Sequence, residues 1–169
     1  MRTGTWRPDP DAVGILRDKV LGPGSVPGFF PLLVSVVLLM AGNGLLGSLV
    51  GVRGAIEGYG DATLGVIVAG FYAGYLLGSF GTPALIVGVG HVRVFAALAS
   101  LASAAVLIQA VLLEPVAWLG LRFVTGACIA GLFVVVESWL TGETTASNRG
   151  RVFGLYMTVL LGAMAGGQF

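Results

Sequence analysis

The chain has 169 residues, of which 56% are hydrophobic and only 10% charged, and its mean hydropathy is +0.96. A soluble domain carries about a quarter charged residues, so this composition excludes an ordinary soluble protein and indicates a membrane protein. The nine basic residues form no patch, and the net charge of +1 gives no sign of nucleic-acid binding. With one cysteine and one histidine, neither an internal disulfide nor a metal site is expected, and no cofactor is predicted.

Residues 1–28 form a polar tail, which we expect to lie in the cytoplasm. Within it, prolines bracket residues 11–21, whose apolar residues have helical spacing; this segment is expected either on the membrane surface or as a solvated arm. The apolar run after the tail is too long for a removable signal peptide and lacks its cleavage site. Residues 29–169 are therefore predicted to form one transmembrane helical domain.

Five apolar runs of 18 to 25 residues make up this domain. About 20 residues span a bilayer core of roughly 30 Å, so each run predicts a transmembrane helix and the fold class is all-α and multi-pass. The expected helices are 29–52, 63–81, 94–113, 116–140 and 152–169. The second helix is predicted to end near Gly81, because Pro83 and further glycines follow. The last stops at Phe169 without a flanking charge, which predicts a chain truncated in its fifth helix.

The basic residues predict the orientation, because lysine and arginine favour the cytoplasmic side. Seven of the nine fall on one side: Arg2, Arg7, Arg17 and Lys19 in the tail, Arg93 in the second connection, and Arg149 and Arg151 in the fourth. We therefore expect a cytoplasmic N-terminus and a location in the cytoplasmic (inner) membrane.

A weak internal repeat relates the second and fifth runs. Residues 70–78 and 154–162 are identical at five of nine positions, at a constant offset of 84. The two helices are predicted to run in opposite directions, so the repeat is inverted in the membrane. A three-helix unit followed by its inverted copy is typical of secondary transporters.

Arg122 is the leading functional candidate, because it lies inside the fourth run with only uncharged residues between it and Glu137. On a helix, the two charges are about 22 Å apart along the axis and within about 60° of each other around it. Arg122 either lines a pathway or extends its long side chain to the interface. Glu137 either lies at headgroup level or pairs with Arg93, Arg149 or Arg151 as a latch between helix ends.

Other residues are weaker candidates for a functional or packing role. Asn43, between two glycines in the first run, either lines a cavity or bonds a neighbouring helix, and Gln109 has the same two interpretations. Glycines at a spacing of four residues form ridges that predict close helix packing, at Gly70, Gly74 and Gly78 and at Gly162 and Gly166. No serine hydrolase motif and no phosphate-binding loop occur, so an enzyme is not expected.

The segment from Leu121 to Ala130, with Arg122 followed four residues later by Gly126, resembles the arginine motif of the major facilitator superfamily. The likeness covers roughly residues 29–169 and implies the amino-terminal half of a carrier with 3+3 inverted repeats, in which Arg122 faces the central cavity. Residues 137–140, 148–151 and 156–157 are similar to a bacterial subgroup of mostly unassigned substrate. The connection around Gly90 and Arg93 departs from the family, since Val87 and Gly88 replace its Asp-Arg pair. The fifth run lacks the proline of the antiporter motif, so no antiporter is predicted.

The sequence thus predicts a secondary active transporter that moves a small solute by alternating access, coupled to protons. Its partners would be the solute, protons, the lipid bilayer and a second helical half. The alternative is a non-transporting membrane scaffold or assembly subunit. A pathway predicts polar residues that converge on one cavity, whereas a scaffold predicts polar residues that face separate neighbours.

Overall fold

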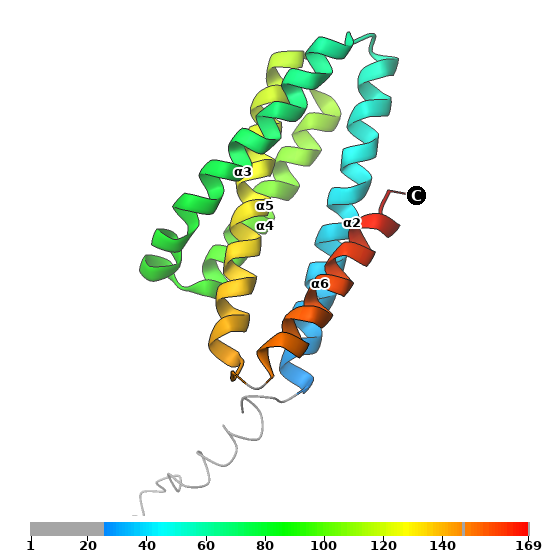
Figure 1. The fold of residues 1–169 in the computed structure, drawn as a ribbon. Coiled ribbons are helices and arrows are strands. Elements are labelled where there is room, and N and C mark those ends of the chain that lie inside the picture. Colours follow the sequence, from blue (N-terminus) through cyan, green and yellow to red (C-terminus); the bar gives the residue numbers. More distant parts are fainter. Residues whose placement is uncertain (1–25, 147, 169) are drawn as a thin grey trace, which may run out of the picture. The chain divides into compact units, whose positions relative to one another are not determined.

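The computed structural model describes residues 26–146 and 148–168, with side chains from Leu33 onward. The helices are α2 (Val26–Ile56), α3 (Asp61–Val89), α4 (His91–Val111), α5 (Pro115–Glu143) and α6 (Arg149–Gly166) (Figure 1). No strand occurs in the described ranges, so the prediction of an all-α chain with five helices is confirmed. The segment 11–21 and most of the predicted tail lie outside the described residues.

Four of these helices, α2 to α5, are long and apolar enough to cross a membrane. The fifth, α6, has only 18 residues, and Arg149 and Arg151 occupy its first turn. Its apolar part is therefore shorter than the span expected for residues 152–169. The other helices begin and end within a few residues of the predicted bounds, except α3.

Helix α3 continues well past the predicted end at Gly81, and Pro83 lies inside it. Proline removes one helical hydrogen bond, but membrane helices tolerate it where nearby serine and threonine side chains supply other polar contacts. Here the hydroxyls of Ser79 and Thr82 donate to the carbonyls of Tyr75 and Gly78 at 2.8 Å, next to the Ser79 carbonyl that Pro83 leaves without its helical donor. The helix ends instead at Gly90, whose φ of 91° favours glycine.

The described helices belong to two compact units, one comprising residues up to Leu46 and from Glu143 onward, the other Gly47–Gly142. In the second unit, the ridge of Gly70, Gly74 and Gly78 on α3 packs directly against α5. A Cβ atom at any of these glycines would come within 3.0 Å of α5, at the positions Leu119, Phe123 and Ala127 respectively. Because the partner numbers rise together in steps of four, α3 and α5 run parallel and in register.

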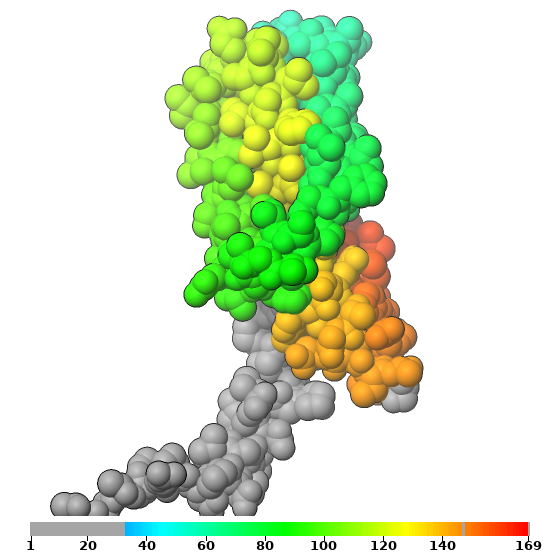
Figure 2. Space-filling model, turned by 90° about the vertical axis from the view of Figure 1, so that its left-hand side faces the viewer, coloured from blue at the N-terminus to red at the C-terminus, as the bar shows by residue number. Residues whose placement is uncertain are grey.

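Helix α5 is the most enclosed helix of this unit. It meets α4 as well as α3, since a Cβ at Gly131 would collide with both Leu98 of α4 and Thr82 of α3. On the face drawn in Figure 2, α5 (yellow) is seen between α4 (yellow-green) and α3 (teal to green). Only four residues are buried in each of α3 and α4, whereas α5 buries twelve: Trp118, Arg122, Thr125, Gly126, Cys128, Ile129, Ala130, Gly131, Leu132, Val135, Val136 and Leu140.

In the other unit, α2 and α6 also approach through glycine. A Cβ at Gly44 would meet the carbonyl of Met164, and one at Gly167 would meet the carbonyl of Ala41. The expected ridge of Gly162 and Gly166 does not make this contact, because a Cβ at either position would meet nothing within 4 Å. Small residues recur along α6 as the sequence indicates. The glycine that meets α2, however, is Gly167, just after the helix, and not Gly162 or Gly166.

The close contact between α3 and α5 predicts a large difference between two glycines of the same helix. Gly74→Ala places a methyl group against the Phe123 carbonyl, which cannot move without separating the helices, so the free energy of unfolding should fall by about 1–3 kcal/mol. Gly81→Ala enters open space and should leave stability unchanged or slightly higher. Thermal unfolding of the two variants in the same detergent measures the contrast, and equal melting temperatures would contradict it.

Candidate functional site

Arg122 lies in the second turn of α5, and its side chain is only 5% exposed. An arginine in the apolar part of a membrane helix costs roughly 2.5–3.5 kcal/mol on insertion scales, so it is rarely left facing lipid. Arg122 also takes part in polar interactions with the rest of the protein. The side chain therefore points into protein, and it is not stretched out along the lipid boundary.

Arg122 lies at the edge of the α5 surface that packs on α3. At about 100° per residue, it is about 40° around the helix from Gly126, which meets α3, and about 180° from Gly131, which meets α4 and α3. Other residues on the same side of α5 as Arg122 are buried as well: Trp118, Ile129, Val136 and Leu140. Arg122 is thus the charged group of an otherwise apolar, enclosed helix face.

The residues one turn after Arg122 are Thr125, which bonds within α5, and Gly126, which packs on α3. The Thr125 hydroxyl lies 3.0 Å from the carbonyl oxygen of Leu121 and 2.9 Å from that of Arg122, so its hydrogen-bonding capacity is used within the helix. Gly126, the glycine of the arginine motif, packs against α3, where a Cβ would meet the Phe71 carbonyl. The glycine holds the two backbones together, and Arg122 extends from the adjoining face.

Glu137 lies near the other end of α5 and is half-buried. It makes no hydrogen bond or ion pair with any residue of the described ranges, and the exposed Arg93 and Arg151 make none there either. Within the unit Gly47–Gly142, the expected ion pair between Glu137 and Arg93 is therefore not formed, and the pairs of Glu137 with Arg149 and Arg151 stay predictions. Arg149 is exposed at the start of α6 and has interactions of its own.

A contact that the sequence did not suggest joins α4 and α5 next to Glu137. The Nε2 atom of His91 lies 3.1 Å from the hydroxyl of Ser138. His91 directly follows Gly90, so the turn that ends α3 also brings the first residue of α4 to α5. The only signal in the sequence was that a histidine and a serine stand in the two segments expected on the same side of the membrane.

Asn43 is half-buried in α2, in the unit that also contains α6. Of its flanking glycines, Gly44 touches the α6 backbone, whereas a Cβ at Gly42 would meet no atom within 4 Å. Asn43 therefore lies beside a close helix contact but does not create it. Its role remains a prediction.

Gln109 is the most deeply buried amide of the described chain, at 3% exposure. It continues the α4 stripe of Val94, Ala102 and Ala105, on the same face as Leu98, which contacts α5. Neither its Nε2 nor its Oε1 has a hydrogen-bond partner among the described residues. An amide left in this state costs about 1–3 kcal/mol, so it is available to bond a water molecule or another polar group.

Four apolar helices are long enough to span a membrane, and one of them carries a buried arginine. These features define a multi-pass α-helical membrane protein. Comparison with known proteins supports the same class. The chain is 31% identical over 128 residues to the "Uncharacterized MFS-type transporter YcaD" of Escherichia coli O139:H28 (strain E24377A / ETEC), a match that covers 76% of this chain and 34% of the relative. The proteins of that name from Escherichia coli O9:H4 (strain HS) and Escherichia coli (strain K12 / DH10B) match equally well.

The chain thus spans about a third of the length of the curated relatives it matches. Their names contain the abbreviation MFS, for the major facilitator superfamily, to which the arginine motif pointed. The matched region of this chain is a distant homologue of such a transporter. No known protein-family profile matches the chain. No solved structure matches it either.

The buried amide generates a stability prediction. Gln109→Leu replaces the amide by an apolar side chain of similar size and should raise the free energy of unfolding by about 1–2 kcal/mol, because an unbonded polar group leaves the interior. Gln109→Glu is the matched control and should lower it. Thermal unfolding in detergent measures both, and a loss of stability in Gln109→Leu would show that the amide is bonded in the folded protein.

Proposed function

We propose that this chain forms part of a secondary active transporter, which moves a small solute by alternating access. The observation that carries the proposal is the burial of Arg122, which is only 5% exposed in the apolar part of α5. A charge retained inside a membrane protein usually marks a substrate or ion pathway or a proton relay. The names of the relatives support transport over the alternative of a scaffold.

Two roles are open to the Arg122 guanidinium in such a carrier. It has five N–H donors and a permanent charge, so it can bind a carboxylate or another oxyanion of the solute with two parallel hydrogen bonds. It can also lower the pKa of a carboxyl group elsewhere in the complete carrier and thereby couple transport to protons. We favour proton coupling, with the remaining helices of the carrier completing the central site.

The proposed orientation follows from the basic residues: a cytoplasmic N-terminus in the inner membrane, with Arg93, Arg149 and Arg151 on the cytoplasmic side. Asn43 would add a hydrogen-bonding group to the pathway. Gly90 and the three arginines would form the cytoplasmic gate. In this scheme Glu137, which is unpaired in the present structure, forms an ion pair with one of these arginines in another state of the cycle.

The first test concerns Arg122 in vesicles that contain the complete carrier, with a solute first identified by a ligand-dependent thermal-shift screen. Arg122→Ala should reduce the transport rate about 10- to 100-fold, because it removes a charge-assisted hydrogen bond in a dry site. Arg122→Lys keeps the charge and should retain more activity. Arg53→Ala, at the exposed end of α2, is the control for insertion and should leave transport unchanged. Full activity of Arg122→Ala would remove its proposed role.

The second test concerns the gate. Glu137→Gln cannot form the ion pair, so it should shift the carrier away from the state in which that pair is made. Single cysteines placed on the two sides of the pathway report this shift as a change in their labelling rates. Glu143→Gln, at the end of the same helix, is the matched control. Identical labelling of Glu137→Gln and the parent protein would exclude the latch.

A further inference from the structure

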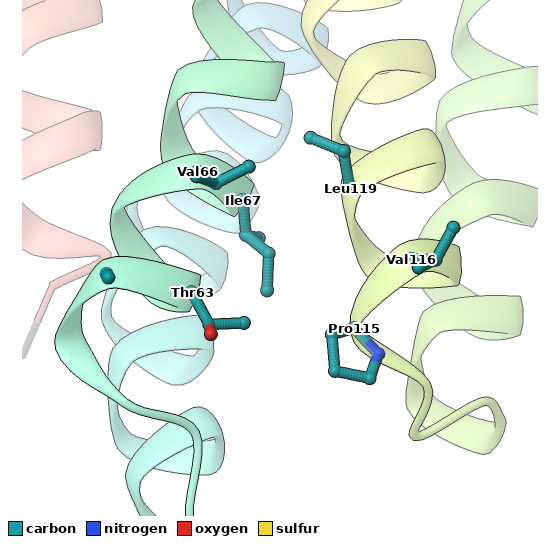
Figure 3. A pocket seen from close by; sticks show the side chains of 7 residues that line it. Thr63, Val66, Ile67, Pro115, Val116 and Leu119 are labelled. Carbon is teal, nitrogen blue, oxygen red and sulfur yellow. The ribbon is translucent and has the colours of Figure 1, made fainter.

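A groove of about 320 Å³ opens between the first turns of α3 and α5 (Figure 3). Its volume lies at the lower end of the range for ligand sites, about 300–1,000 Å³. One wall consists of Ala62, Thr63, Val66 and Ile67 of α3, and the other of Pro115, Val116 and Leu119 of α5. The figure shows side chains of the two helices facing each other across the gap. All lining residues belong to the unit Gly47–Gly142.

The lining is suited to a hydrocarbon chain. Thr63 contributes the one polar side chain of the groove. Ile67 is 1% exposed and belongs to the core, whereas Val66 and Val116 are 56% and 81% exposed and stand at the open side. The groove therefore reaches from an apolar floor to the outer surface of two membrane helices, where a lipid-soluble chain can enter.

Two carboxylates adjoin lining residues of the groove along the chain. Asp61 directly precedes the lining residue Ala62, and Glu114 directly precedes Pro115; both side chains are exposed. Within the described part of the chain neither one forms an ion pair. The nearby Glu57 differs, because its carboxylate is bound to Arg53 at 2.8 Å. This end of the groove, called its mouth below, thus has two adjoining carboxylates that form no ion pair within the described ranges.

Aromatic contacts hold the mouth in place. The Tyr59 hydroxyl donates to the Leu113 carbonyl, and the Trp118 indole N–H donates to the Leu112 carbonyl at 2.6 Å. The rings of Tyr59 and Trp118 pack edge to face, with centroids 5.4 Å apart. These contacts join the α2–α3 connection to the α4–α5 connection, which includes Glu114. Burial, and then the charges of Glu57 and Glu114, raise the pKa of Tyr59, while Arg53 lowers it.

We propose that this groove binds a single-chain cationic amphiphile, with its hydrocarbon chain between α3 and α5 and its ammonium group at Asp61 and Glu114. The apolar lining by itself would not select a ligand inside a bilayer, because lipid tails are equally apolar. Selection comes from the mouth, where the two carboxylates attract an ammonium group and repel a phosphate or sulfate. The site does not depend on the transport mechanism proposed above or on Arg122.

The experiment uses the full-length protein in phosphatidylcholine nanodiscs at low salt. The probe is an alkyltrimethylammonium with a photoreactive diazirine on its chain, and mass spectrometry locates the labelled peptides. We expect adducts within residues 62–67 and 115–119. An alcohol and a sulfate with the same chain should label these residues less. Labelling only elsewhere, or equal labelling by all three probes, would overturn the proposal.

Variants separate the two parts of the site. Asp61→Asn/Glu114→Gln should reduce labelling by the ammonium probe about threefold to tenfold and leave labelling by the alcohol unchanged. Glu57→Gln is the matched control, since that carboxylate is already paired, and should have little effect. Val116→Phe fills the groove from its exposed side and should reduce labelling by both probes; Val66→Phe is a second filling variant if the first does not fold. Unchanged labelling in the carboxylate variant and in a folded filling variant would contradict the site.

Discussion

The direct backbone contact between α3 and α5 is the constraint on which the described structure depends. Gly74 and Gly78 of α3 and Gly126 of α5 lie against backbone atoms that leave no room for a Cβ, and Gly70 lies against the Leu119 side chain. Between membrane helices this packing replaces the hydrophobic effect, because lipid offers no water to exclude. The contact fixes both the parallel register of the two helices and the rotation of α5 about its axis. That rotation decides which residues of α5 face protein.

Arg122 is buried as a consequence of this rotation. With Gly126 against α3 and Gly131 against α4 and α3, Arg122 lies beside the α3 contact and among buried residues of α5. The same rotation turns Leu119 toward Gly70 and places Val116 at the open side of the groove. A single helix thus supplies an arginine to the protein interior and one wall of an apolar groove to the surface. Substitutions in the glycine ridge would disturb both features together.

Features that depend on composition and spacing could be predicted from the sequence. Apolar runs gave the five helices, the four-residue glycine spacing gave the α3 ridge, and the isolated arginine marked the enclosed helix. Helix-breaking residues were less informative, because Pro83 was expected to end α3 but lies within it. The bond between His91 and Ser138 and the unbonded amide of Gln109 depend on tertiary contacts, which no spacing along one helix can reveal.

The internal repeat shows why a shared pattern does not imply a shared environment. Tyr72 and Tyr156 occupy equivalent places in the two repeated segments, yet Tyr72 is 66% exposed and Tyr156 only 1%. The glycines differ in the same way, since Gly78 touches the α5 backbone while Gly162 has open space around its Cα. Helix geometry determines the direction in which each side chain leaves its own axis, and this is common to both copies. Burial depends on which neighbour lies in that direction, and the neighbours of α3 and α6 are different helices.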